Sequence, residues 1–284
     1  MYEAFYGFRE RPFALTPDPE FLYPSRHHQL ALTVLEYGVL NRAGFCLLTG
    51  EVGSGKTLLI RRLLSRLDAD TRVGLVSNTN RHFGRLLQWV CLAYGLDFDK
   101  KDDAELYRTF VDFLLSEYAS GRRVLLIVDE AQNLDALMLE ELRVLSNVNA
   151  DKHFVLQTIL VGQPELRDTL RRTELRQFAQ RIGIDYHLPL LNQAETRNYV
   201  RHRLTVAGGD PGLIEQDAVD LVHSRSGGVP RLINQLLDMA LVYGFADQRS
   251  CIDIGVAEQV VADRVAGGLF PAISLAAEAT GKID

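Results

Sequence analysis

Residues 50–57 read GEVGSGKT and satisfy the pattern G-x-x-x-x-G-K-[ST]. The pattern follows the short apolar run 45–48 and opens a segment whose apolar residues recur with a helical period through Leu63 and Leu67. Glycines at such a junction let the backbone curl, so that successive N–H groups and the helix N-terminus face a phosphate. The stretch therefore predicts a strand, a phosphate-binding loop and a helix. The residues predicted to bind a nucleotide here are Gly50, Glu51, Val52, Gly53, Ser54, Gly55, Lys56, Thr57 and Leu58.

An acidic pair, Asp129-Glu130, follows the uninterrupted apolar run 124–128. A run without alternation is typical of a central strand buried on both faces, so we expect the pair at the carboxyl edge of the sheet, beside the phosphate loop. Lys56 is expected to reach the β and γ phosphate oxygens of ATP, and Thr57 and Asp129 to hold Mg²⁺. Glu130 is expected to orient and deprotonate a water molecule. The pair therefore favours ATP hydrolysis over transfer of phosphate to a small molecule.

Two amides follow further strand candidates. Gln163 comes after the apolar run 154–161 and is predicted to lie level with Asp129 on the adjacent strand, where its amide holds the water or the γ-phosphate. The alternative is a simple turn former. Asn78 ends the candidate strand 72–77 and has two readings, a partner that holds Glu130 in an inactive rotamer or a residue without a role in the site.

Arginines are dense before the last strand candidate and, by their spacing, are expected to crowd parts of one helix surface: Arg167, Arg171, Arg172, Arg176 and Arg181. A solvated helix face explains most of them. Arg181, five residues before the strand predicted at 186–191, is expected to stabilise the γ-phosphate of a neighbouring subunit, with Arg176 as the alternative. Arg231 lies in the first turn of a later helix, where the dipole disfavours a cation by about 0.3–1 kcal/mol. Either a phosphate from the first domain compensates, or Arg231 simply faces solvent.

Strands alternate with helices up to about residue 190, and the pattern beyond is helical. This predicts an α/β domain over 1–190 with a parallel sheet, a helical lid over 191–265 and a flexible tail over 266–284. Asn192 with Glu195 forms a capping-box pattern that begins the first lid helix. The aromatic and proline-rich segment 1–24 is assigned to the α/β domain. Its aromatic side chains, Phe8, Phe13 and Tyr23 among them, are expected to pack in a core rather than to stack on adenine.

Composition excludes several classes of protein. The 284 residues are 47% hydrophobic and 24% charged, which is typical of a folded globular chain. A net charge of −6 has the wrong sign for strong non-specific binding of nucleic acid. Three distant cysteines and scattered histidines predict neither a disulfide framework nor a metal site of those residues. We find no transmembrane or signal segment, and we expect a cytoplasmic location.

Five motifs, in this order and spacing, carry a resemblance to a known family: GEVGSGKT, VLLIVDEAQ, LVGQPEL, LRQFAQRI and SGGVPRLIN. Together with the opening MYEAFYGFRERPFALTPDPEFLY, they resemble the AAA+ ATPases of the ExeA (general secretion pathway protein A) type. That type also includes MshM and the ATPases found with exosortase and exopolysaccharide systems. Residues 1–265 take part in the match. Secretion members continue into a membrane segment and a peptidoglycan-binding region, so we do not expect these 284 residues to bind the cell wall directly.

The resemblance implies a role for each predicted site residue. Lys56 and Thr57 match Walker A, and Asp129 and Glu130 match Walker B. The remaining matches are Gln163 at sensor 1, Arg181 at the arginine finger and Arg231 at sensor 2. The resemblance also implies a sheet of order 5-1-4-3-2, a helical lid, ATP with Mg²⁺, and ring or filament homo-oligomers.

We therefore expect an ATPase that drives assembly or operation of an envelope export system, whether for secretion, pilus or exopolysaccharide. It would lie in the cytoplasm, peripheral to the inner membrane through partner proteins. The alternative is a DNA-associated AAA+ ATPase of the transposition or replication-initiation type, motivated by the arginine-rich stretch 167–181. A third possibility is a nucleotide switch with little turnover, which Glu130 disfavours.

Overall fold

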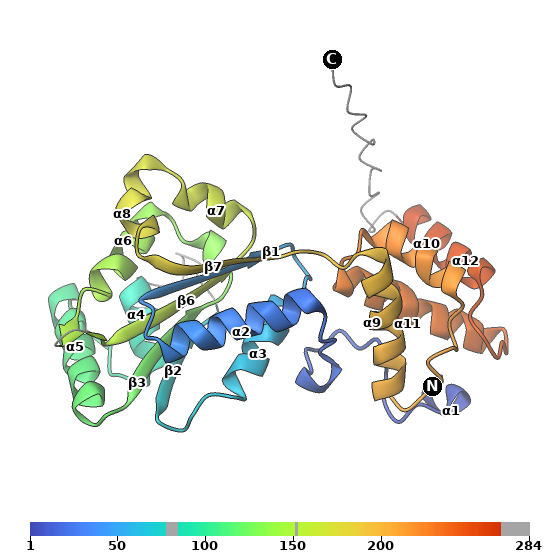
Figure 1. Ribbon diagram of the computed structural model, residues 1–284, viewed down its shortest axis with the longest axis horizontal. Coiled ribbons are helices and arrows are strands. Elements are labelled where there is room, and N and C mark those ends of the chain that lie inside the picture. Colours follow the sequence, from blue (N-terminus) through green and yellow to red (C-terminus); the bar gives the residue numbers. More distant parts are fainter. Residues whose placement is uncertain (78–84, 151–152, 268–284) are drawn as a thin grey trace, which may run out of the picture. The chain divides into compact units, whose positions relative to one another are not determined.

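The computed structural model describes residues 1–77, 85–150 and 153–267, and its contacts divide the chain into two compact units (Figure 1). One unit is Pro24–Pro189 and contains the sheet. The other combines Met1–Tyr23 with the chain from Leu190 onward, and its described elements are helices. The sequence pattern assigns residues 1–24 to the α/β domain, and the structure corrects this: the first 23 residues pack with the helical unit.

The central sheet has the order β2-β3-β6-β1-β7, and its neighbouring strands are parallel. Counting these five strands along the chain, the order is 2-3-4-1-5, which is the predicted 5-1-4-3-2 read from the other edge. The predicted fold class is therefore confirmed. The strands are β1 Phe45–Gly50, β2 Thr71–Val76, β3 Arg123–Val128, β6 Leu156–Gly162 and β7 Ile182–Leu188. A separate hairpin pairs β4, Asn149–Ala150, with β5, His153–Phe154.

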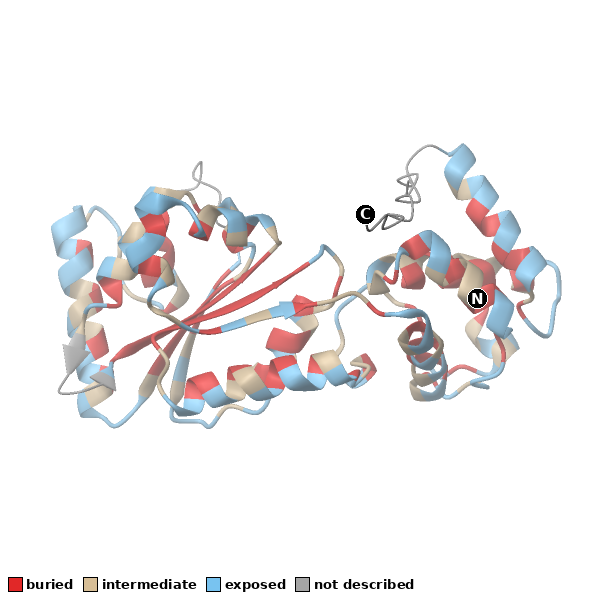
Figure 2. Cartoon of the chain, turned by 45° about the horizontal axis from the view of Figure 1, so that its top comes forward, coloured by how far each residue is buried: buried red, intermediate tan, exposed pale blue. Residues whose placement is uncertain are grey.

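Helices cover both faces of the sheet, so the inner strands are buried apart from the partly buried Arg123 at the start of β3 (Figure 2). Alternate residues of β3 enter different cores: Leu125 and Ile127 pack with α2 and α3, whereas Leu126 and Val128 pack with the helices of the other face. This explains why β3 reads as an uninterrupted apolar run. The first face carries α2 Arg26–Leu40 and α3 Lys56–Leu64. The second carries α4 Leu86–Ala93, α5 Asp103–Ala119, α6 Ala136–Leu145, α7 Glu165–Leu170 and α8 Arg176–Ala179.

Two local predictions before residue 190 are wrong. The last strand is expected at 186–191 but is β7, Ile182–Leu188. It is an edge strand with few fully buried positions, so its apolar signal is weaker than that of an inner strand. The arginine-rich stretch is expected on one helix surface, but α7 and α8 are separated by the 3-10 turn Thr173–Leu175, and Arg172 is extended with ψ 144°.

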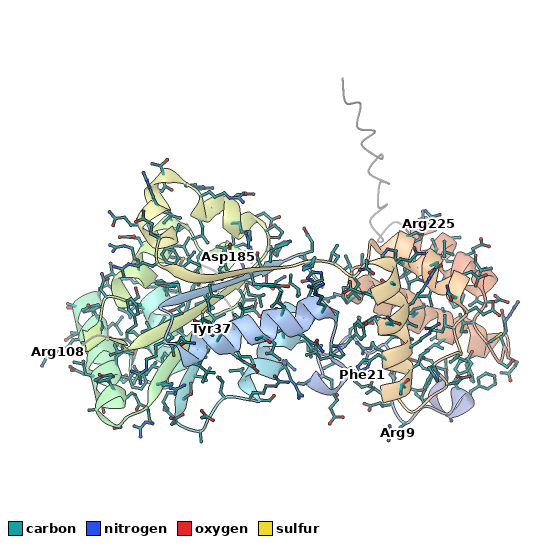
Figure 3. All side chains as sticks on the ribbon, in the orientation of Figure 1. Arg9, Phe21, Tyr37, Arg108, Asp185 and Arg225 are labelled. Atoms are coloured by element: carbon teal, nitrogen blue, oxygen red, sulfur yellow. The ribbon has the colours of Figure 1, made fainter. Side chains whose placement is uncertain are left out.

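The N-terminal segment packs into the core of the helical unit. Asn192 and Glu195 form the predicted capping box, and Gly227 ends α10 in the left-handed conformation. Phe8, Phe13 and Phe21, the last labelled in Figure 3, are buried in the core of this unit, which confirms core packing for this segment. The elements are α1 Glu3–Tyr6, the 3-10 turn Pro19–Phe21, α9 Gln193–Val206, α10 Gln216–Ser226, α11 Pro230–Ala246 and α12 Ile254–Ala266. The tail predicted at 266–284 lies outside the described residues from 268 onward.

Candidate nucleotide-binding site

The glycine-rich loop joins β1 to α3 at the carboxyl edge of the sheet. Gly50 ends the strand, and a Cβ added there would lie 2.8 Å from the carbonyl oxygen of Leu188 on β7. Gly55 precedes the helix at φ 104°, a left-handed conformation that favours glycine. The loop between these two glycines leads directly into α3, whose first residue is Lys56. This is the local geometry of an anion cradle.

Lys56 is buried against its own loop. Its Nζ donates to the carbonyl oxygens of Gly50 at 2.7 Å and Glu51 at 2.9 Å. Burial lowers the pKa of the Lys56 ammonium, and the nearby carboxylates of Glu130 and Asp129 oppose that shift without cancelling it. The ammonium is therefore poorly solvated, and an anion entering the loop would relieve that cost.

The acidic pair lies directly across from the start of α3. The backbone N–H of Asp129 donates to the carbonyl of Val76 at 2.8 Å, which fixes the end of β3 against β2. Its carboxylate accepts from the hydroxyl of Thr57 at 3.3 Å and from the N–H of Glu130 at 2.9 Å. Burial, followed by the charge of Glu130, raises the pKa of the Asp129 carboxyl. The structure thus brings together the two oxygen-bearing side chains, from Thr57 and Asp129, predicted to hold Mg²⁺.

Glu130 is held by two glutamines. One is Gln163, whose Nε2 lies 3.4 Å from Glu130 Oε2. The other is Gln132, whose Nε2 donates to the same oxygen at 2.6 Å and whose Oε1 accepts from the N–H of Gln163 at 3.0 Å. Sequence reasoning gave Gln132 no role, although it stands two residues after Glu130 in the same motif. Asn78, the predicted partner of Glu130, lies outside the described residues.

His28, near the start of α2, is a second residue that sequence reasoning missed. Its buried ring lies 2.8 Å from Ser25 Oγ through Nδ1 and 3.2 Å from the carbonyl oxygen of Ser54 through Nε2. A Cβ added to Gly55 would lie 3.1 Å from the ring. The histidine therefore supports the loop from behind. Only the tertiary fold brings residue 28 to residue 54, so no local pattern signals the contact.

The residues present fit a nucleotide with a divalent cation. Ser54 is 1% exposed, and its Oγ has no hydrogen-bond partner among the residues that the structure describes, so the loop contains a buried polar atom that could bind a ligand. Thr57 and Asp129 supply the oxygen donors that Mg²⁺ prefers. Within residues 1–77, 85–150 and 153–267, no group of three or more His, Cys, Asp and Glu side chains is arranged to hold a metal.

Arg181 lies at the opposite end of the sheet from the loop. It directly precedes β7, and the register pairs Phe45 with Ile182 at one end of the strands and Gly50 with Leu188 at the other. Five residues of strand separate these pairs, which is about 17 Å at roughly 3.3 Å per residue. Its Nη1 donates to Ser146 Oγ at 3.0 Å and to the carbonyl of Arg143 at 3.3 Å. Arg181 is therefore too far away to serve the loop of its own chain.

Three other arginines line a cavity of about 580 Å³ between α7, α8 and β7: Arg167, Arg171 and Arg176. Arg167 is already paired with Asp185, labelled in Figure 3, and donates to Thr49 Oγ1 at 2.6 Å. Arg172 and Arg231 are exposed, the latter in the first turn of α11 in the helical unit.

Known proteins are similar to this chain in sequence. A family model described as an AAA domain matches residues 40–170. General secretion pathway protein A of Aeromonas hydrophila is 43% identical over 247 residues, which cover 87% of this chain and 45% of that protein. The chain thus spans less than half the length of that relative.

Solved structures share the fold at low sequence identity. The ORC2 protein of Aeropyrum pernix, in its ADPNP and ADP complexes, has a TM-score of 0.68 at 19% identity, covering 90% of this chain and 72% of that one. The ORC1 protein of the same organism, in complex with DNA, has a TM-score of 0.65 at 18% identity, covering 90% and 70%. The RuvB branch migration motor of Thermotoga maritima has a TM-score of 0.53 at 18% identity, covering 89% and 72%. No helix among the described residues is both long and apolar enough to cross a bilayer.

Proposed function

The chain belongs to the AAA+ ATPases of the ExeA (general secretion pathway protein A) type, and from that premise we propose that it hydrolyses ATP to drive a bacterial envelope export system. The observation that carries the hydrolysis is the contact of Thr57 with Asp129 at 3.3 Å, with Glu130 beside it. It places a hydroxyl from the start of α3 against the acidic pair at the sheet edge. The export role is supported by the name of the 43% identical relative.

Each side chain has a proposed task in the reaction. Lys56 leaves the carbonyls of Gly50 and Glu51 and binds the β and γ phosphate oxygens, together with the N–H groups of the loop. Glu130 accepts a proton from a water molecule as the oxygen of that water bonds to the γ-phosphorus. At the same time, the bond from the γ-phosphorus to the bridging oxygen breaks, and ADP keeps the electron pair. Gln163 orients the water. A magnesium ion held by Thr57 and Asp129 would neutralise phosphate charge when bound.

The site is proposed to be completed by a second copy of the chain in a ring or filament. Arg181 lies about five strand residues from its own phosphate loop, a separation that supports a role for its guanidinium only in a neighbouring subunit. Arg231, exposed in the first turn of α11, is proposed to reach the phosphates from the helical unit. The assembled ATPase would work with envelope proteins at the inner membrane.

Two variants test the hydrolysis. Lys56→Ala should abolish ATP binding and turnover, whereas Glu130→Gln should keep binding and lose turnover by about 10²–10⁴-fold, because only the proton acceptor is removed. The measurements are phosphate release and the affinity for an ATP analogue. A Lys56→Ala protein that hydrolyses ATP at the parental rate would refute the assigned site.

Sharing of sites between subunits is tested by mixing. Glu130→Gln subunits keep Arg181, and Arg181→Ala subunits keep Glu130, so mixed assemblies contain some complete sites. Turnover above that of either variant alone supports an arginine acting in trans. No gain at any ratio counts against it.

The second candidate is a DNA-associated ATPase, favoured by the exposed Arg171, which lines the arginine-rich cavity, and by its exposed neighbour Arg172. Duplex binding that weakens steeply with salt, and that is lost in the Arg171→Ala/Arg172→Ala double variant, would support this candidate over the export role.

A further inference from the structure

We infer that Gln132 is a positioning residue that holds the carboxylate of Glu130 against the strand end that bears Gln163, an inference that rests on the hydrolysis proposed above. Gln132 follows Glu130 in the 3-10 turn Ala131–Asn133, directly after β3. Its amide joins the ends of two adjacent inner strands, β3 and β6.

The amide lies between two groups of opposite hydrogen-bonding character. Its Nε2 donates to the Glu130 carboxylate at 2.6 Å, and its Oε1 accepts from the backbone N–H of Gln163 at 3.0 Å. A carboxylate only accepts and a backbone N–H only donates, so one orientation of the amide satisfies both and the reverse satisfies neither. The bridge is therefore specific for an amide, because neither a carboxylate nor an alkyl group at position 132 can make both bonds.

The surrounding backbone leaves space for this amide. Gly162 ends β6, and a Cβ added there would lie 3.2 Å from Gln132 Oε1 and 2.8 Å from Leu166 Cδ2. A side chain at 162 would crowd the Gln132 oxygen. The glycine of the LVGQ motif thus makes room for the residue that bridges the strands.

Glu130 combines an uncommon backbone conformation with an exposed side chain. It has φ 53° and ψ 37°, a left-handed conformation that is uncommon for a residue other than glycine. Its side chain is exposed, so burial does not select one rotamer. Gln132 is partly buried and donates from a fixed position, which keeps the carboxylate where a proton acceptor is required.

The effect of Gln132 is separable from nucleotide binding. Among the described residues, its side-chain hydrogen bonds go to Glu130 and Gln163 and none goes to the loop 50–57. Loss of the bridge should therefore lower kcat and leave nucleotide affinity unchanged. Substitution of a residue with a purely structural role would lower kcat and nucleotide affinity together.

The decisive variant is Gln132→Glu, measured in the full chain with ATP and Mg²⁺. It keeps an oxygen that accepts from Gln163 N–H but replaces the donor to Glu130 with a second carboxylate oxygen. We expect kcat at pH 7 to fall by at least about 10-fold, since a positioned proton acceptor contributes about 10²–10⁴-fold. The Kd of a non-hydrolysable ATP analogue should stay within about twofold of the parent value.

Two further variants complete the test. Gln132→Leu removes both hydrogen bonds without adding charge, so it should lower kcat to a similar extent. Asn133→Ala, at the exposed next position of the same turn, is the matched control and should keep the parental kcat. The inference is overturned if Gln132→Glu keeps kcat within about twofold or loses analogue affinity in parallel. Failure of the proposed function differs from these outcomes, because the parental chain would then show no turnover that Lys56→Ala removes.

Discussion

Lys56 in the α/β unit and Arg203 in the helical unit are the buried lysine and arginine side chains among the described residues, at 9% and 5% exposure. Lys56 donates to two carbonyls of its own loop. Arg203 donates to the carbonyl of Pro12 at 2.5 Å, to that of Ala14 at 3.3 Å and to Tyr199 Oη at 3.0 Å, and its guanidinium lies 4.7 Å from the centre of the Phe21 ring. Both cations are desolvated, but their partners differ.

The partners determine what each cation can do. The carbonyls that hold Lys56 belong to residues five and six positions before it, so the fold does not depend on these contacts and an incoming phosphate can replace them. The carbonyls that hold Arg203 belong to a segment about 190 residues away, which this guanidinium fastens to α9. A buried cation indicates a ligand site only where its contacts can be exchanged without loss of structure.

The largest expected effect is a difference in unfolding free energy between a variant of Arg203 and a variant of Lys56. Arg203→Met keeps the aliphatic packing but leaves the carbonyls of Pro12 and Ala14 without their donor, and should cost about 2–4 kcal/mol of unfolding free energy. Lys56→Met should change it by less than about 1 kcal/mol, since replacing a desolvated charge by an apolar chain is often neutral. Denaturant unfolding measures both, and faster amide exchange over residues 8–21 in Arg203→Met would locate the loss. Equal destabilisation by the two substitutions would refute the comparison.

A smaller effect is expected at the support behind the loop. His28→Ala removes the ring that meets the carbonyl of Ser54, and should weaken binding of an ATP analogue by about 3- to 10-fold, the equivalent of roughly one hydrogen bond. His27→Ala is the matched control, because the ring of His27 meets Tyr186 Oη at 3.2 Å instead of the loop. If both variants bind with the same affinity as the parent, His28 does not set the loop geometry.

We expect the ionised carboxylate of Asp129 to reduce the stability of the α/β unit. Burial raises the pKa of this carboxyl, so the native state retains the proton to higher pH than the unfolded chain. Ionised Asp129 therefore lowers stability at neutral pH. Nucleotide-free Asp129→Asn should be at least as stable as the parent at pH 7, and the difference should shrink as the pH falls towards about 4. A variant less stable than the parent at pH 7 would contradict this expectation.

The smallest expected effect on unfolding free energy concerns Tyr2, at the start of the N-terminal segment. Tyr2 donates to Asp238 at 2.5 Å, and burial and that bond raise the pKa of its phenol above the ordinary value of 10.0. The native state thus holds a proton that the unfolded chain releases above about pH 10, so the stability from this contact is complete below pH 10 and is lost as the pH rises further. Tyr2→Phe should lower unfolding free energy by about 1 kcal/mol at pH 8 and flatten its fall above pH 10. An unchanged slope would assign the alkaline loss to other groups.

The chemistry of the site was readable wherever it lay in one continuous stretch of chain. GEVGSGKT gave the loop, Lys56 and Thr57, because the spacing of glycine, lysine and threonine is itself the geometry of a curled backbone before a helix. The apolar run before Asp129 gave the position of the acidic pair, because a strand buried on both faces must end at the sheet edge. The start of the helical unit followed from its capping pattern, because Asn192 and Glu195 begin α9 as their residue types predict.

Side-chain contacts between distant segments were decided by tertiary structure alone. His28 meets the carbonyl of Ser54, Gln132 bridges to the strand end before Gln163, and Arg203 fastens residues 12–14, yet none of these belongs to a spacing pattern. The assignment of residues 1–23 to the helical unit has the same origin, since an aromatic segment can pack equally well in any core that offers space. Local sequence fixes backbone conformation and charge, because these depend on neighbours along the chain. Which side chain supports which functional group depends on how sheet and helices bring remote residues within about 3 Å, the distance at which a hydrogen bond forms.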